Sequence, residues 1–144
     1  MLQRLKNIPY YYWLLLGYHL ISIYFAYTIR VERGIADSQL YWFQNEYTQG
    51  KSYFVYVGSI HPRKNLSGLV RSFEKFCATN TSVDLVIVGE AMWKDNLQQM
   101  ITNPLVQSRI HSVGRVSDND LQAIIGASLA LCYIPFFEGF GIPV

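Results

Sequence analysis

Charge and cysteine are both scarce in this chain, and each shortage argues against a class of function. Charged residues make up 15% of its 144 residues, and the formal net charge is +2. The basic residues are scattered rather than gathered into a stripe, so no nucleic-acid partner is expected. The two cysteines, Cys77 and Cys132, stand far apart among apolar neighbours, which favours reduced core thiols over a disulfide or a metal site.

Clusters of metal ligands are lacking as well. No group of His, Cys or carboxylate residues has the spacing of a metal site, so no metal is predicted. The nearest approach is Asp118-Asn119-Asp120, whose D-x-D spacing holds a divalent cation in some transferases. Because Ser117 precedes this triplet and an apolar periodic run follows it, the pattern favours a helix start instead.

Residues 1–40 form an apolar segment rich in aromatic side chains. Ten of the eleven tyrosines fall in residues 1–56, and the stretch from Ile8 to Ile29 contains no Asp, Glu, Lys or Arg. Its length suits a membrane span, but six tyrosines lower its hydropathy, and basic residues flank both of its ends. A membrane interface, a partner surface and sequence foreign to the domain all remain open here. Membrane association through Ile8 to Ile29 is one of these expectations.

Strands and helices alternate from Ser52 onward. Apolar runs predict four strands, at residues 53–57, 83–88, 110–113 and 129–134. Helical periodicity lies between them, at residues 66–76, at residues 93–101, and after the N-cap Ser117. Strands that are apolar throughout, alternating with amphipathic helices, indicate a parallel sheet covered on both faces. The predicted fold class is therefore α/β, with a Rossmann-like parallel sheet in residues 45–144.

In such a sheet, ligands bind beyond the carboxyl ends of the strands, so the loops at residues 59–65, 90–92, 115–116 and 135–141 are the candidate sites. The first loop holds Arg63 and Lys64 directly before a helix, where two cations and the helix N-terminus suit a phosphate group. A solvated basic pair, beside a helix cap at Asn65, is the open alternative. His61 is interpreted as a loop histidine rather than a base.

The last candidate loop contains Glu138, which follows a fully apolar strand and lies between Phe137 and Gly139. A carboxylate there can accept hydrogen bonds from the hydroxyl groups of a ligand, while the neighbouring glycines let that ligand approach the backbone. An exposed loop glutamate without a ligand is the equally open alternative.

Four sequence blocks carry a family resemblance. They are Tyr-Val-Gly-Ser-Ile-His-Pro-Arg-Lys-Asn (56–65), Val-Ile-Val-Gly-Glu (86–90), Gly-Arg-Val-Ser-Asp-Asn-Asp-Leu (114–121) and Phe-Glu-Gly-Phe-Gly-Ile-Pro-Val (137–144). In this order and spacing, they resemble the group 1, or family 4, retaining glycosyltransferases. The resemblance implies that residues 45–144 are part of the C-terminal, nucleotide-sugar-binding domain of a GT-B fold.

The resemblance also implies roles for individual residues. Lys64 and Arg63 would hold the diphosphate of the donor, and Glu138 would be the first glutamate of an E-x7-E motif that binds hydroxyls of the transferred sugar. These three are the expected catalytic residues. The remaining expected donor-binding residues are backbone or loop positions: Gly58 and Ser59 after the first strand, Arg115 and Val116 near the base, and Gly139, Phe140 and Gly141 facing the sugar and phosphate. Several relatives have an arginine where this chain has Ser59.

The reaction implied by the family moves a hexose from a nucleotide diphosphate sugar to a hydroxyl of a sugar or lipid-linked acceptor, with retention and without a metal or other cofactor. Relatives that build bacterial surface polysaccharides imply a cytoplasmic location, peripheral to the inner membrane. The second glutamate of the motif would fall at position 146, so the sequence predicts a fragment that is inactive as an isolated chain. A flavodoxin-like nucleotide-binding module and a membrane-anchored accessory protein are the alternatives.

Overall fold

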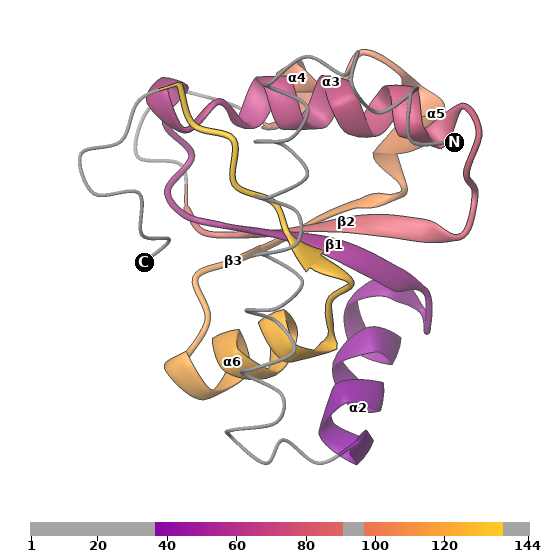
Figure 1. Cartoon of the computed structure of the whole chain (residues 1–144), viewed down its shortest axis with the longest axis vertical. Coiled ribbons are helices and arrows are strands. Elements are labelled where there is room, and N and C mark those ends of the chain that lie inside the picture. Colours follow the sequence, from indigo (N-terminus) through magenta and orange to yellow (C-terminus); the bar gives the residue numbers. More distant parts are fainter. Residues whose placement is uncertain (1–36, 91–96, 137–144) are drawn as a thin grey trace, which may run out of the picture.

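The computed structural model describes residues 37–90 and 97–136, and in them four parallel strands form one sheet (Figure 1). The order across the sheet is β3-β2-β1-β4, and every neighbouring pair is parallel. The strands are β1 (Ser52–Val57), β2 (Val83–Val88), β3 (Ile110–Gly114) and β4 (Ala130–Leu131). The predicted Rossmann-like α/β class is confirmed.

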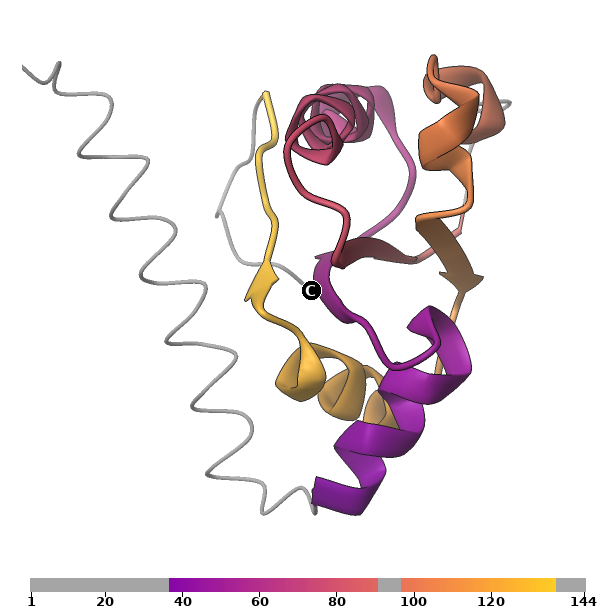
Figure 2. The same ribbon diagram turned by 90° about the vertical axis from the view of Figure 1, so that its right-hand side faces the viewer.

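Helices cover both faces of this sheet. On one face lie α3 (Leu66–Cys77), α4 (Leu97–Met100) and α5 (Pro104–Gln107), and on the other lie α2 (Asp37–Thr48) and α6 (Asp118–Ala127) (Figures 1 and 2). A short 3-10 helix, η2 (Pro62–Lys64), precedes α3. Because the central strands β1 and β2 are buried between two helical layers, their sequences are apolar almost without interruption.

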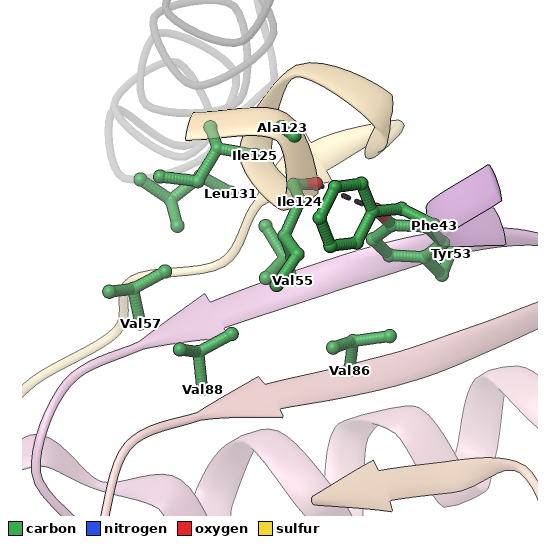
Figure 3. Close-up of a cluster of buried hydrophobic side chains, with 10 residues drawn as sticks. All are labelled: Phe43, Tyr53, Val55, Val57, Val86, Val88, Ala123, Ile124, Ile125 and Leu131. Carbon is green, nitrogen blue, oxygen red and sulfur yellow. Dashed lines mark hydrogen bonds between the residues drawn. The ribbon is translucent and has the colours of Figure 1, made fainter. Parts of the chain in front are cut away.

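Alternate residues of the central strands supply two separate hydrophobic clusters. Val86 and Val88 of β2 face α2 and α6, where they join Val55 and Ile124 in the cluster drawn in Figure 3. Leu85 and Ile87 face the other way and pack with Tyr56 and the apolar stripe of α3. Each of these aliphatic side chains is fully or almost fully buried, and such burial stabilises a fold by roughly 1.5–3 kcal/mol per side chain.

Helix α2 was not predicted from the sequence. Its Phe43 lies in the same cluster as Tyr53, whose hydroxyl donates to the Ile124 carbonyl at 2.7 Å (Figure 3). The neighbouring Tyr41 and Trp42 are exposed, so the apolar residues of α2 do not share one face, and the usual helical periodicity is blurred. The helix also begins ahead of residue 45, where the nucleotide-binding segment was expected to start.

The fourth predicted strand is longer than the observed one, and the second predicted helix is described only in part. The fourth strand was predicted to run from residue 129 to residue 134, whereas β4 spans only Ala130–Leu131. The amide of Cys132 still donates to Val55 at 2.7 Å, but the chain then turns toward the loop that follows β1. Of the helix predicted at residues 93–101, the structure describes Leu97–Met100 as α4, and the preceding residues lie outside the described part.

The two cysteines were predicted to be reduced core thiols. Cys77 and Cys132 are both free thiols and are partly buried against the cluster beneath α3. Burial raises the pKa of the Cys132 thiol to about 11, and it also raises the pKa of Cys77. Neither thiol therefore has the character of a reactive thiolate at neutral pH.

Within residues 37–90 and 97–136, no helix is long and apolar enough to cross a membrane. The stretch from Ile8 to Ile29, in which membrane association was expected, lies outside these residues.

Candidate functional site

The order of the strands creates one position at which a ligand is expected. From β1 the chain proceeds to β2 and β3 on one side, and it then returns to β4 on the other side of β1. Ligands of open α/β sheets bind where the strand order reverses in this way, beyond the carboxyl ends of the two strands. The loops after β1 and β4 flank that position, and they are the loops predicted to hold the phosphate-binding and sugar-binding residues.

Glycines end the two central strands at this edge. Gly58 and Gly89 have φ angles of +147° and +137°, which favour glycine. A Cβ atom at position 89 would lie 2.1 Å from the carbonyl oxygen of Gly58, so the two turns cross in direct backbone contact. The floor of the edge beside β1 is therefore backbone rather than side chain, which leaves a ligand access to peptide groups.

The loop after β1 is shaped by its own polar groups. The His61 ring Nδ1 accepts a hydrogen bond from the Arg63 amide at 3.2 Å and so caps η2, in agreement with its interpretation as a loop histidine. Asn65 follows in the left-handed conformation, with φ 56° and ψ 34°. It holds the N-cap position of α3, as expected, but its side chain makes no capping hydrogen bond.

Of the two cations in this loop, Arg63 is exposed and Lys64 is half-buried. The Lys64 Nζ atom lies 3.4 Å from the hydroxyl of Tyr133 and 5.3 Å from the centre of its ring. A cation over an aromatic ring at this distance is attracted by the ring's π-face. Tyr133 thus helps to fix the lysine at the carboxyl edge of the sheet, a role that the sequence did not reveal because Tyr133 lies within an apolar run.

Two further contacts join the loop after β1 to the segment after β4. The Phe136 amide donates to the Arg63 carbonyl at 2.9 Å, and the Asn65 side chain donates to the Ile134 carbonyl at 3.0 Å. In Figure 1 the yellow segment after β4 accordingly runs up to the loop that enters α3. The two loops that flank the strand reversal are therefore held together by three contacts across about 70 residues of sequence.

The remaining predicted site residues divide into two groups. Gly58 and Ser59 lie at the end of β1, where the Ser59 carbonyl accepts a hydrogen bond from the Tyr56 hydroxyl at 3.0 Å. Arg115 is exposed and Val116 packs against the core, both beyond β3, which lies two strands or about 10 Å from β1. Outside the described residues lie Glu138, Gly139, Phe140 and Gly141.

Ser117 and the acidic triplet behind it form a helix N-terminus. The Ser117 Oγ accepts a hydrogen bond from the Asp120 amide at 3.2 Å and donates to the Asp120 carboxylate at 2.8 Å. Asp118 and Asp120 lie in the first turn of α6, where negative charge is favourable. The predicted helix start is confirmed. In the part of the chain that the structure describes, no group of three His, Cys, Asp or Glu residues could hold a metal.

A second polar cluster, which was not predicted, lies at the opposite, amino edge of the sheet. Asp84 of β2 is 1% exposed, and its carboxylate lies 2.8 Å from His111 Nε2 and 3.5 Å from both Lys51 Nζ and Arg109 Nε. The Arg109 guanidinium also donates to the Asn80 and Val83 carbonyls. These groups pair their charges inside the fold, far from the strand reversal, although the Asp84 Oδ1 and Arg109 Nε atoms make no hydrogen bond among the described residues.

A shallow hollow of about 370 Å³ lies beside the edge strand β3. The side chains that line it are apolar or carry an amide or hydroxyl group, and none is charged. They are Leu97, Gln98, Ile101, Gln107, Ile110 and Ser112. A diphosphate needs cations or a helix N-terminus, so this hollow does not compete with the strand reversal as the site.

Fold and site together define an α/β domain with a candidate ligand site at the carboxyl edge of its sheet. The family model described as "Glycosyl transferases group 1" matches residues 38–144, and the chain belongs to that family. Among curated proteins it is 31% identical over 96 residues to O-antigen chain mannosyltransferase B of Escherichia coli, covering 65% of this chain and 25% of that protein. It is also 31% identical over 94 residues to O-antigen chain mannosyltransferase RfbU of Salmonella typhimurium, covering 65% and 26%.

The chain thus spans about a quarter of the length of these curated relatives. Among solved structures, it is similar to sucrose-phosphate synthase from Thermosynechococcus elongatus, with a TM-score of 0.52 and 16% identity over 80% of this chain and 27% of that one. At that identity the likeness concerns the fold alone, and it agrees with the predicted GT-B architecture.

Proposed function

We propose that this group 1 glycosyltransferase domain binds a nucleotide diphosphate sugar at the strand reversal between β1 and β4, for transfer of the hexose with retention to a hydroxyl of a sugar or lipid-linked acceptor. The observation that carries the proposal is the junction of the two flanking loops. It places Arg63, Lys64 and the N-terminus of α3 beside the segment that leads into Glu138. In this arrangement Arg63 and Lys64 bind the diphosphate, and Glu138 binds the sugar hydroxyls.

The charges of the site suit the bond that breaks. When the glycosidic bond of the donor is cleaved, negative charge develops on the leaving diphosphate. Two cations and the N-terminus of the twelve-residue α3 stabilise that charge, and they accelerate the reaction to the extent that they favour the transition state over the bound donor. The position of Lys64 is better defined than that of Arg63, because the Lys64 Nζ atom contacts the hydroxyl and the ring of Tyr133.

Mannose is the first sugar to test, because the Escherichia coli and Salmonella relatives are named as mannosyltransferases. The same names, which refer to O-antigen chains, support an acceptor in surface polysaccharide synthesis. We also propose the expected cytoplasmic location, peripheral to the inner membrane, where donor and growing chain would meet. Gly58 and Ser59 then lie beside the diphosphate, with Arg115 and Val116 toward the base and Gly139, Phe140 and Gly141 toward the sugar.

Calorimetric titration of the full chain tests donor binding directly. GDP-mannose, UDP-glucose and UDP-N-acetylglucosamine are compared with free GDP and UDP under the same salt conditions. We expect one nucleotide sugar to bind more tightly than its own free diphosphate, because the sugar adds contacts to Glu138. Equal binding of the free diphosphate would favour a nucleotide-binding module instead, and a chain that binds none of the five would overturn the proposal.

A further inference from the structure

We propose that Asn65 is a positioning residue, which fixes the segment after β4 against the loop that carries Arg63 and Lys64. The inference rests on the proposed donor site and names a further part of it. Asn65 lies at the junction of η2 and α3. Its side-chain amide donates a hydrogen bond to the Ile134 carbonyl, in the segment after β4, at 3.0 Å. Ile134 precedes Glu138, the proposed sugar-binding residue, by four positions in the sequence.

Asn65 maintains this bond in an unfavourable setting. Its backbone is left-handed, at φ 56°, which costs a non-glycine residue free energy even though asparagine tolerates it better than most. Its Oδ1 atom is buried and has no hydrogen-bond partner among the described residues. Its side chain also makes no capping hydrogen bond to the N-terminus of α3. Left-handed backbone at a non-glycine residue is found preferentially at functional sites, where a precise geometry outweighs local stability.

Gly68 provides the space for the Asn65 side chain. A Cβ atom at position 68 would lie 2.4 Å from the Asn65 Oδ1 and 2.8 Å from both Cγ and Nδ2. Any residue larger than glycine therefore forces the amide away from Ile134. Glycine is otherwise a poor choice in the first turn of α3, because it weakens the helix relative to alanine. The glycine and the asparagine thus form a matched pair that keeps the amide over the segment after β4.

The consequence concerns the relative placement of two binding elements. Arg63 and Lys64 are local to the loop before α3, whereas the segment that leads into Glu138 reaches the same edge from the other side of β1. Two hydrogen bonds fix the position of the segment after β4 relative to the loop before α3. They are the bond from Asn65 to Ile134 and the bond from the Phe136 amide to the Arg63 carbonyl. Loss of the Asn65 bond should therefore weaken recognition of the sugar more than recognition of the diphosphate.

The test uses Asn65→Gly, which keeps the left-handed backbone available, and Gly68→Ala, which displaces the amide while strengthening the helix. The first measurement is the ratio of the dissociation constants for free GDP and GDP-mannose, or for whichever pair the wild-type chain binds. We expect both variants to lower this preference for the sugar by about three- to tenfold, the effect of one lost hydrogen bond. Asn45→Ala is the control, because it removes a similar 3.0 Å amide bond, to the Tyr41 carbonyl on α2.

A second measurement needs no ligand. Amide hydrogen exchange at Phe136 should become about tenfold faster in both variants, while the Cys132 amide, which donates to Val55 beside β4, keeps its protection. If the wild-type chain binds no nucleotide, the proposed donor site fails, but the exchange rates still decide whether Asn65 holds the segment. Unchanged exchange at Phe136 in both variants overturns the inference. So does an equal loss of affinity for sugar nucleotide and free diphosphate.

Discussion

The amino and carboxyl edges of the same sheet carry polar residues of similar types in opposite settings. At the amino edge, Asp84 is almost fully buried and is surrounded by Lys51, Arg109 and His111. At the carboxyl edge, the cations lie on loops, and Arg63 is exposed to solvent. The residues at the amino edge pair their charges within the fold, and those at the carboxyl edge flank the proposed ligand site. The two groups of residues are similar in type, but they differ in burial and in the edge of the sheet at which they lie. These two differences are the basis for assigning one group to stability and proposing a binding role for the other.

The largest effect is expected at the amino edge. Asp84→Asn leaves three basic groups around a neutral amide, and removing one partner of a buried ion pair costs roughly 3–5 kcal/mol. We expect the free energy of unfolding, measured by urea denaturation, to fall by about 3 kcal/mol. Asp118→Asn is the matched control, because Asp118 is exposed at the start of α6. A loss below about 1 kcal/mol, typical of an exposed pair, would show that the cluster contributes little.

At the carboxyl edge, loss of charged side chains should alter binding instead. Arg63→Ala combined with Lys64→Ala removes two charge-assisted contacts to a diphosphate, each worth about 1.5–3 kcal/mol. We expect the affinity for a nucleotide diphosphate, measured by calorimetry, to fall at least about 30-fold with little change in the melting temperature. Lys75→Ala, at the exposed far end of α3, controls for net charge. If Lys75→Ala weakens binding equally, the effect is general electrostatics and not a site.

The carboxyl group of Glu74, on α3, should make the free energy of unfolding depend on pH. Burial raises the pKa of its carboxyl group, but hydrogen bonds from the Asn103 amide and the Thr102 hydroxyl and amide, with Arg71 nearby, lower it more, so the pKa lies below 4.5. A lowered folded-state pKa gives stability that is present above pH 4.5 and is lost as the pH falls through the folded value.

Glu74→Gln should therefore lower the free energy of unfolding at pH 7 by about 1–2 kcal/mol, since one side-chain carbonyl replaces a charged acceptor of three bonds. The gap between variant and wild type, followed by urea denaturation from pH 7 to pH 3, should narrow below about pH 4.5. A gap that is constant over that range would mean that the carboxylate charge plays no part.

The smallest effect belongs to a structural residue at the carboxyl edge. Ser117→Ala removes the cap of α6 and should lower the free energy of unfolding by about 1 kcal/mol. Thermal unfolding with and without Mg²⁺ or Mn²⁺ provides the measurement. The same small loss is expected with and without the ions, because Asp118 and Asp120 serve the helix. Stabilisation of the wild-type chain by either ion, absent in the variant, would contradict that role.

The fold was largely predictable because each central strand is an almost continuous apolar run followed by glycine, and this signal is local. Val83–Val88 was predicted to the residue, and the helix behind Ser117 was found from its cap. Helix α2 was missed, since Trp42 and Tyr41 are exposed beside the buried Phe43 and no single face is apolar. β4 was predicted too long, because the residues after Leu131 remain apolar while they leave the sheet for the neighbouring loop.

The site was predictable only in part. Arg63 and Lys64 stand out in a loop between strand and helix, and their loop does lie at the strand reversal. The contacts of Lys64 with Tyr133 and of Asn65 with Ile134 join residues 69 positions apart. A local sequence pattern does not predict such contacts, because they depend on which strand pairs with β1 in the sheet. The roles predicted for Glu138, Arg115 and the glycines after Glu138 stay predictions.

The crossing of the turns at Gly58 and Gly89 also has a consequence for how the sequence can evolve. The atom that would obstruct a side chain at position 89 is a backbone carbonyl oxygen, and every amino acid has one. No second substitution at position 58 can relieve the clash, in contrast to a clash between side chains. Position 89 should therefore stay glycine through long divergence, even where the residues around it drift freely and the preferred sugar changes.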